Sequence, residues 1–338
     1  MNAHSQFQDH TPYSAPFEQI GHLNIDHAED CVDLSSGNTR FSAKRNGLGF
    51  SSALLRDTYS LYSLGTAPRE ALWLMNASPD TTLGRFVSGR GRIRSLAVQP
   101  FVSAEWSSST RMRRMMDHCA IVDALGHPFD IHGAQYVEVA HFRLGEDDCR
   151  LTLDRPKWLE NDGMLCASLW AGPDRIFSVS FCLSTSSTGR TAFIGGLQGR
   201  KSLDALDQNR LLTKAAHGLR PRDLAIELFR MLAPYMHVTH IEGVADASRY
   251  QLTRRAILPK GLSDKVLLDY DEIWESRGGT RGADGFFAIP VANPRRDINE
   301  LPSKKRSMYK RRYDLLDLIE HQVASSFRTG TRIHNHLF

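Results

Sequence analysis

The stretch RIFSVSFCLSTSSTGRTAFIGGLQG, residues 175–199, decides the fold of this chain. Two runs rich in Val, Ile, Phe and Thr flank a segment of Ser, Thr and Gly at residues 184–190, which is the pattern of a β-hairpin. Three further runs of strand-like sequence precede it, at residues 136–144, 149–154 and 164–171. We therefore predict a succession of strands that ends in this hairpin.

A helix and another strand follow the hairpin. In residues 220–233 the apolar residues Leu224, Leu228 and Met231 fall on one helical face, and Pro221 suits the first helical position. We therefore expect the helix to begin at Arg220 or Pro221 and the run HVTHIEGV, residues 237–244, to form a strand. This order predicts an α/β or α+β fold with a mixed sheet. It resembles the strand-helix-strand layout in which acyl-CoA transferases of the GNAT type hold pyrophosphate.

The rest of the chain divides by composition. Residues 1–48 are polar and show no sustained period, which predicts a poorly ordered leader. Helical spacing in residues 51–77 and a serine-capped pattern ending at Gly126 predict a helical N-terminal module over residues 49–150. We place the mixed α/β core at residues 151–326 and a frayed tail at residues 327–338.

Composition excludes several classes of protein. The chain has 338 residues, 41% of them hydrophobic, and a net charge of +4, which is too weak to indicate nucleic-acid binding. It contains no run of roughly 18 apolar residues, so we expect no transmembrane segment and a cytoplasmic location. The five cysteines form no CxxC pair, and the histidines show no ligand spacing, so we predict no metal site.

The segment HGLRPRD at the start of the predicted helix has two interpretations. Unpaired backbone N–H groups, the small Gly218 and the cations Arg220 and Arg222 could hold a phosphate or carboxylate. Alternatively, these arginines pair with nearby acids such as Asp223 or Glu227, and the glycine only makes a turn.

A basic segment precedes an apolar one near the carboxyl end, in SKKRSMYKRRYDLLDLIEHQVASSF. At about 100° per residue, several of its cations share a sector of one helix with Ile319 and Val323. A single continuous helix would then bring these cations toward its packing side, where they could bind a phosphorylated substrate or anionic lipid. A solvated basic face is the other interpretation. The cations that we assign to anion binding are Lys304, Lys305, Arg306, Arg311 and Arg312.

Four motifs together resemble one family: FIGGLQG, HGLRPRDL, YDEIWESRGG and PSKKRSMYKRRYDLL, in this order. They are similar to those of the VirK/YbjX family of bacterial proteins, and the similarity runs from about residue 50 to 325. His118 also stands where the family tends to have a histidine. The resemblance implies a cytoplasmic protein linked to envelope remodelling, antimicrobial-peptide resistance and virulence, and it implies no established reaction.

Two functions fit these residues. In the first, a GNAT-like enzyme transfers an acyl or related group from acyl-CoA or another phosphate-bearing donor, which Gly218, Arg220 and Arg222 hold. His217 or Asp271 would act as the base, Gln198 would orient the substrate, and His118 and Trp274 would join the anion-binding set. In the second, the protein is a non-enzymatic stress factor that binds anionic membrane lipid or a partner protein through its basic motifs.

Overall fold

The computed structural model describes residue 65 and residues 67–90, 101–133, 135–200, 204–249, 268–292 and 295–335. All of these belong to one unit, which spans Phe50–Phe338. The predicted leader and the first part of the predicted helical module lie outside the described residues.

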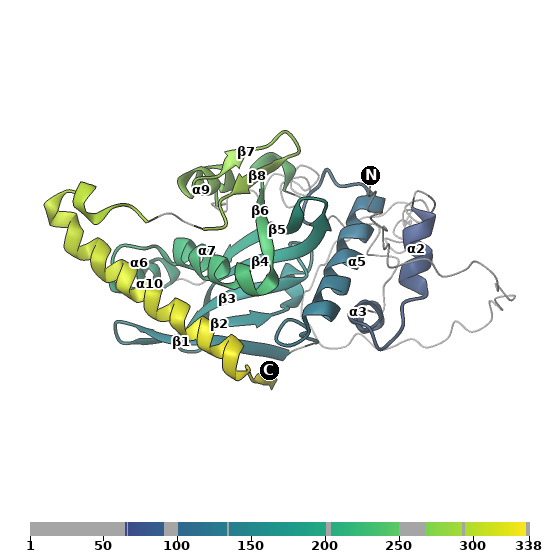
Figure 1. Ribbon diagram of the computed structural model, residues 1–338, viewed down its shortest axis with the longest axis horizontal. Helices are drawn as coiled ribbons and strands as arrows, with labels where there is room; N and C mark the ends of the chain where they lie inside the picture. Colours follow the sequence, from purple (N-terminus) through teal and green to yellow (C-terminus); the bar gives the residue numbers. More distant parts are fainter. Residues whose placement is uncertain are drawn as a thin grey trace, which may run out of the picture. The chain divides into compact units, whose positions relative to one another are not determined.

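One nine-stranded sheet dominates the described part of the chain (Figure 1), with strand order β7-β8-β6-β5-β4-β3-β2-β1-β9. The mixed α/β fold is therefore confirmed, and the sheet is mostly antiparallel. Its strands are β1 (Gln135–Leu144), β2 (Asp147–Asp154), β3 (Leu165–Ala171), β4 (Asp174–Ser186), β5 (Gly189–Gly199), β6 (Val238–Val244), β7 (Thr280–Arg281), β8 (Phe286–Ile289) and β9 (Ile333–Asn335).

The predicted hairpin is β4 and β5, which pair antiparallel from Ser186↔Gly189 to Phe177↔Gly199. Strand β6 then pairs parallel with β5, so the chain between them has to cross back over the sheet. This crossover contains α6 (Ala205–Ala215) and α7 (Pro221–Leu232). On its other side β6 pairs antiparallel with β8.

Three helices contact the sheet most closely (Figure 1): α5 (Ser108–Leu125) contacts β4, α7 contacts β3 and β4, and α10 (Ser303–Thr329) contacts β1. Short 3-10 helices occur at Lys157–Leu159, Ala233–Met236, Asp246–Ser248 and Ile298–Glu300. The described α-helices are α2 (Pro68–Met75), α3 (Thr82–Arg90), α5 (Ser108–Leu125), α6 (Ala205–Ala215), α7 (Pro221–Leu232), α9 (Tyr270–Ser276) and α10 (Ser303–Thr329).

Helices α5 and α7 cover opposite faces of the sheet. Along β4, side chains alternate between the two faces. Phe181 packs on Phe229 of α7, with ring centroids 4.9 Å apart, whereas Ser184 accepts a hydrogen bond from Arg114 of α5. The face that carries Ser178, Ser180, Cys182 and Ser184 is therefore the α5 face, and the other is the α7 face.

Both helix boundaries predicted from local signals are confirmed. Helix α5 begins after Ser107, whose hydroxyl accepts a hydrogen bond from the Thr110 N–H (3.2 Å), and it ends at Gly126. Helix α7 begins at Pro221, and its first turn carries Asp223. An acidic side chain there is favourable because the helix dipole is positive at that end.

The structure differs from the sequence-based expectations at two places. The sheet begins with β1 at residue 135, within the range that we assigned to the helical module. The carboxyl-terminal tail, expected to fray, forms β9 instead and pairs with β1 through Tyr136↔His334. Tyr136 and His334 also stack, with ring centroids 5.0 Å apart, so an aromatic contact supports this short pairing.

Candidate functional site

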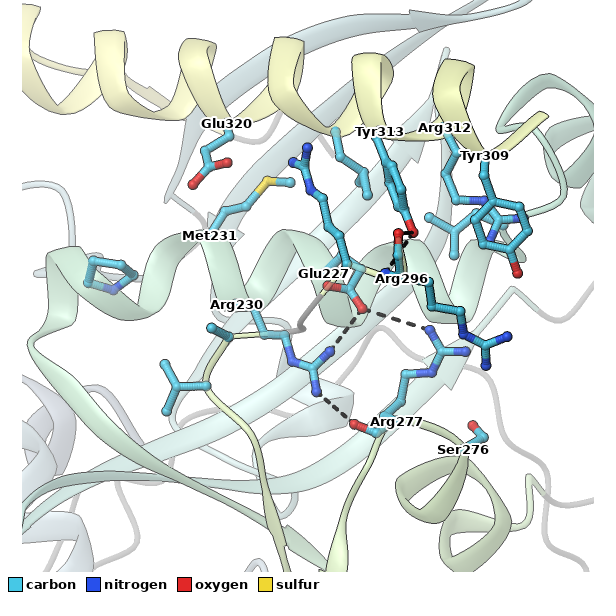
Figure 2. Close-up of a pocket in the computed structure, with 16 residues that line it drawn as sticks. Glu227, Arg230, Met231, Ser276, Arg277, Arg296, Tyr309, Arg312, Tyr313 and Glu320 are labelled. Carbon is cyan, nitrogen blue, oxygen red and sulfur yellow. Dashed lines mark hydrogen bonds and ion pairs between the residues drawn. The ribbon is translucent and has the colours of Figure 1, made fainter. Parts of the chain in front are cut away.

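A cavity of about 390 Å³ lies between α7, α9 and α10, together with the segments after β8. It is lined by five arginines, two glutamates and two tyrosines. Figure 2 shows side chains of α10 pointing from one side toward those of α7 and the end of α9. Its charged and aromatic lining is formed by Glu227, Arg230, Arg277, Arg295, Arg296, Tyr309, Arg312, Tyr313 and Glu320.

Glu227 organises the floor of this cavity. Its carboxylate pairs with Arg230 at 2.9 Å and with Arg277 at 3.7 Å, and Arg230 also donates to the Arg277 carbonyl at 3.1 Å (Figure 2). The side chains of Glu227 and Arg230 are 9% and 4% exposed, so this cluster is shielded from water. The buried Nε atoms of Arg230 and Arg277 have no hydrogen-bond partner among the described residues.

Asp223 extends the same cluster toward the start of α7. Its carboxylate pairs with Arg222 at 3.3 Å and with Arg277 at 3.7 Å. For Arg222, pairing with a neighbouring acid is therefore what the structure shows. Arg220, the N-cap residue of α7, is exposed and makes no side-chain cap.

Arg312 joins α10 to the HGLRPRD segment. Its Nε and Nη2 donate to the His217 carbonyl at 3.2 and 2.8 Å. Gly218 has φ +82°, and a Cβ there would lie 3.0 Å from Arg312 Nη2 and 3.3 Å from Met308 Sδ. A glycine is required at this point both by the backbone conformation and by the close approach of α10.

Two tyrosines complete the α10 wall. The Arg312 guanidinium lies over the ring of Tyr309, 4.4 Å from its centroid, and Arg295 lies 5.1 Å from that of Tyr313. The Tyr313 hydroxyl accepts a hydrogen bond from the Arg296 N–H at 3.1 Å, and Arg295 pairs with Asp317. The rings thus hold the cations in position by cation–π contact.

His217 lies half-buried beside this wall, in the left-handed backbone region with φ +53°. Burial, together with the nearby cations Arg311 and Arg312, lowers the pKa of the His217 imidazole. The ring is therefore neutral near pH 7, which is the form that can accept a proton.

Most of the cations assigned to anion binding on α10 are exposed: Lys304, Lys305 and Arg311. Arg306 donates to the carbonyls of Leu301 and Asn299, so it holds the start of its own helix. The continuous helix formed as expected, yet Arg312 alone of these five lines the cavity.

Three predicted site residues lie away from this cavity. Asp271 accepts a hydrogen bond from the Asp246 N–H at 2.8 Å and pairs with Arg281. Trp274 is fully buried, and its indole N–H donates to the Val244 carbonyl at 2.9 Å. Gln198 lines a second cavity, which lies on the α5 face of the sheet.

His118 is buried in α5, where its Nδ1 accepts a hydrogen bond from the Leu183 N–H at 3.1 Å. Burial, with a contribution from Arg155, lowers the pKa of His118 from 6.5 to about 3. Between about pH 3 and pH 6.5, the folded protein therefore keeps this ring neutral, whereas the unfolded chain protonates it.

This difference predicts an acid-dependent loss of stability. Below pH 6.5 the unfolded state binds the extra proton, so the free energy of unfolding falls by up to about 1.4 kcal/mol per pH unit. His118→Asn should remove this contribution, which urea titrations from neutral to mildly acidic pH would measure as a shallower slope. His141→Asn, at an exposed histidine, is the control; an equal change of slope in both variants would contradict the prediction.

Sequence reasoning missed much of the cavity. Arg230, Arg277, Arg295 and Arg296 come from three separate segments, and none belongs to the residues that we selected. The spacing of Glu227 and Arg230 at i, i+3 was the available signal, since such pairs face each other on a helix.

The described residues contain no group of three or more His, Cys, Asp or Glu side chains placed to hold a metal ion. Within the same residues, none of the helices combines the length and apolar character needed to span a bilayer.

Comparisons with known proteins agree on one family. A family model described as "Protein of unknown function (DUF535)" matches residues 52–325. The chain is 36% identical over 150 residues to "Uncharacterized protein YbjX" of Escherichia coli (strain K12), covering 44% of each. It is 30% identical over 146 residues to an "Uncharacterized protein" of Haemophilus influenzae, covering 43% of this chain and 46% of that protein.

The matched regions thus span about half the length of these curated relatives. No solved structure matches the chain. Because the family model covers most of the chain and the first relative is itself YbjX, the resemblance of the four motifs is confirmed, and the chain belongs to the DUF535 family, in keeping with VirK/YbjX proteins.

Proposed function

We propose that the cavity between α7, α9 and α10 binds a small molecule that carries phosphate. The observation behind this proposal is its charge: five arginines line the cavity, and two of them, Arg296 and Arg312, have no ion pair among the described residues. Guanidinium groups recognise phosphate oxygens through paired N–H donors, and partial burial strengthens such contacts. Ligand cavities are commonly about 300–1,000 Å³, so the volume suits one phosphorylated group rather than a large cofactor held entirely inside.

The cations are already positioned for this task. Glu227 and the Arg277 carbonyl hold Arg230, whereas the His217 carbonyl holds Arg312. A ligand therefore meets guanidinium groups whose conformations are fixed, which lowers the entropic cost of binding. Tyr309 and Tyr313 add ring faces beside the charge.

Group transfer from such a ligand is a second candidate, favoured by the parallel pair β5 and β6 with α7 between them. This arrangement supports a GNAT-like layout, in which the donor would be acyl-CoA and its phosphates would lie near the start of α7, beside Gly218, Arg220 and Arg222. His217, neutral near pH 7, would be the base. We extend the proposal to the setting that the family resemblance implies, a cytoplasmic activity in envelope remodelling or antimicrobial-peptide resistance.

Calorimetric titration with inorganic pyrophosphate, coenzyme A and acetyl-CoA tests the proposal. Arg296→Ala removes an exposed cation of the cavity and keeps the backbone N–H that holds Tyr313. We expect it to weaken binding at least about tenfold, or 1.4 kcal/mol, and Arg312→Ala to weaken it further. Arg311→Ala, one residue away but exposed on α10, should bind like the wild type.

Equal weakening by Arg311→Ala and Arg296→Ala would contradict a specific cavity, as would the absence of binding by all three ligands. Binding of pyrophosphate without any preference for acetyl-CoA, and without release of the coenzyme A thiol, would exclude the acyltransferase candidate. Association with phosphatidylglycerol vesicles that is lost on reversing the charge of Lys304 and Lys305, but kept in Arg296→Ala, would instead support the membrane-binding alternative.

A further inference from the structure

A second cavity, of about 310 Å³, lies on the α5 face of the sheet, where β3, β4 and β5 end near the segment after β2. Two tryptophans, Trp158 and Trp170, form its sides. Arg175, Ser178 and Gln198 contribute the polar groups. None of these residues belongs to the phosphate site proposed above, and the inference below does not depend on that proposal.

A β-bulge brings the polar groups of this cavity together. Leu169 pairs with Phe177 and Trp170 with Arg175, so Ile176 is an extra residue in β4. Strict alternation would put Arg175 and Ser178 on opposite faces, and the bulge turns Arg175 onto the α5 face. There Arg175 donates to the hydroxyls of Ser168 and Ser178.

The cavity carries no net charge to offer a ligand. Arg175 pairs with Asp154, and their side chains are 15% and 1% exposed. The other lining cation, Arg200, pairs with Asp174 at 2.8 Å. Both arginines of this cavity are paired with a carboxylate, whereas Arg296 and Arg312 line the phosphate site without an ion pair among the described residues.

The two indole rings hold the Arg175 guanidinium between them. Its centre lies 4.4 Å from the Trp170 ring centroid and 5.5 Å from that of Trp158. Trp170 is fixed further by its N–H, which donates to the Thr152 hydroxyl at 2.9 Å. Trp158 is 61% exposed, so its indole remains accessible to a ligand.

Gln198 supplies uncharged hydrogen-bonding groups, which the indole ring faces lack. Its side chain lines the cavity, and no hydrogen bond to its amide is present among the described residues. An amide offers both donors and an acceptor, whereas the Ser178 hydroxyl is buried and already bonded to Ser168 and Arg175. A ligand at this point therefore meets an aromatic ring face beside uncharged hydrogen-bonding groups.

We propose that this cavity binds a neutral sugar ring. A pyranose has a face of C–H groups that packs on an indole and an edge of hydroxyls that both donate and accept hydrogen bonds. Trp158 would receive the C–H face, and the Gln198 amide would bond the hydroxyls. An acyl chain would leave this half-buried amide without a partner, at a cost that a hydroxylated ring avoids.

Saturation-transfer NMR with a panel of neutral hexoses and N-acetylhexosamines, as monosaccharides and disaccharides, tests this proposal. We expect transfer to the ring C–H protons of at least one member, with a dissociation constant in the millimolar range. Trp158→Ala should weaken that binding at least about tenfold, and Gln198→Ala should weaken it as well. Trp73→Ala, which removes another half-exposed tryptophan far along the chain, is the matched control and should bind normally.

Two results would overturn the proposal: no member of the panel binds the wild type at saturating concentration, or binding persists in Trp158→Ala. Preference for an uncharged acyl probe, such as monooctanoylglycerol, over every sugar would assign the cavity to a lipid chain instead. Arg296→Ala should leave sugar binding unchanged, so failure here and failure of the phosphate site can be told apart.

Discussion

Asp154→Ala is expected to lower the free energy of unfolding by about 3–5 kcal/mol, because it removes one partner of a buried ion pair. Asp154 is 1% exposed and accepts hydrogen bonds from Arg175 and from the Ser168 hydroxyl. Without the carboxylate, the Arg175 guanidinium remains inside the sheet with only hydroxyl partners. Urea unfolding followed by circular dichroism measures the loss.

Asp174→Ala is the matched control for this variant. Asp174 also pairs with an arginine, Arg200, but its side chain is 33% exposed. Pairs in contact with solvent contribute about 0–1 kcal/mol, so this variant should unfold near the wild-type urea concentration. If Asp154→Ala and Asp174→Ala lost equal amounts of unfolding free energy, burial would not explain the contribution of the Asp154–Arg175 pair.

Trp274→Ala is the second substitution with a large expected effect, also about 3–5 kcal/mol of unfolding free energy. The Trp274 side chain is fully buried in α9, packs directly on Gly243 of β6 and donates to the Val244 carbonyl. Its removal leaves a cavity and a buried carbonyl that has lost this donor. Thermal and urea unfolding should both report the change.

The same variant separates a core role from a role in anion binding. If Trp274 only packs, the folded fraction of Trp274→Ala should bind pyrophosphate with the affinity of the wild type. Trp158→Ala provides the stability control, because an exposed indole over a guanidinium contributes no more than about 1 kcal/mol to the free energy of unfolding. If Trp274→Ala lost pyrophosphate binding but kept its stability, Trp274 would have a role in anion binding.

Short stretches of sequence were sufficient to predict the elements whose conformation depends on neighbouring residues. Two strand-like runs on either side of the Ser, Thr and Gly segment at residues 184–190 located the β4-β5 hairpin, and Pro221 indicated the start of α7. Ser107 and Gly126, a side-chain cap and a residue able to adopt positive φ, delimited α5. These features depend on contacts within a few residues, which a sequence displays directly.

Contacts between segments that are distant in the sequence could not be predicted from it. The polar residues of the YDEIWESRGG motif suggest chemistry, whereas Asp271 holds the backbone of Asp246 and Trp274 fills the space above Gly243. Arg230 was not selected from the sequence, and it is 6% exposed because Glu227 and Arg277 meet it there. Without knowing which helix faces pack together, these roles could not be assigned.

The pairing of β9 with β1 has a consequence for the order in which the protein folds. Close to this pairing, His127 and Thr331 form a hydrogen bond although they lie 204 residues apart in the sequence. During synthesis β1 appears early, but residues 333–335 emerge only after every other strand. The open edge of β1 therefore stays exposed to other chains until residues 333–335 have been made, and truncation near residue 330 should leave this edge open.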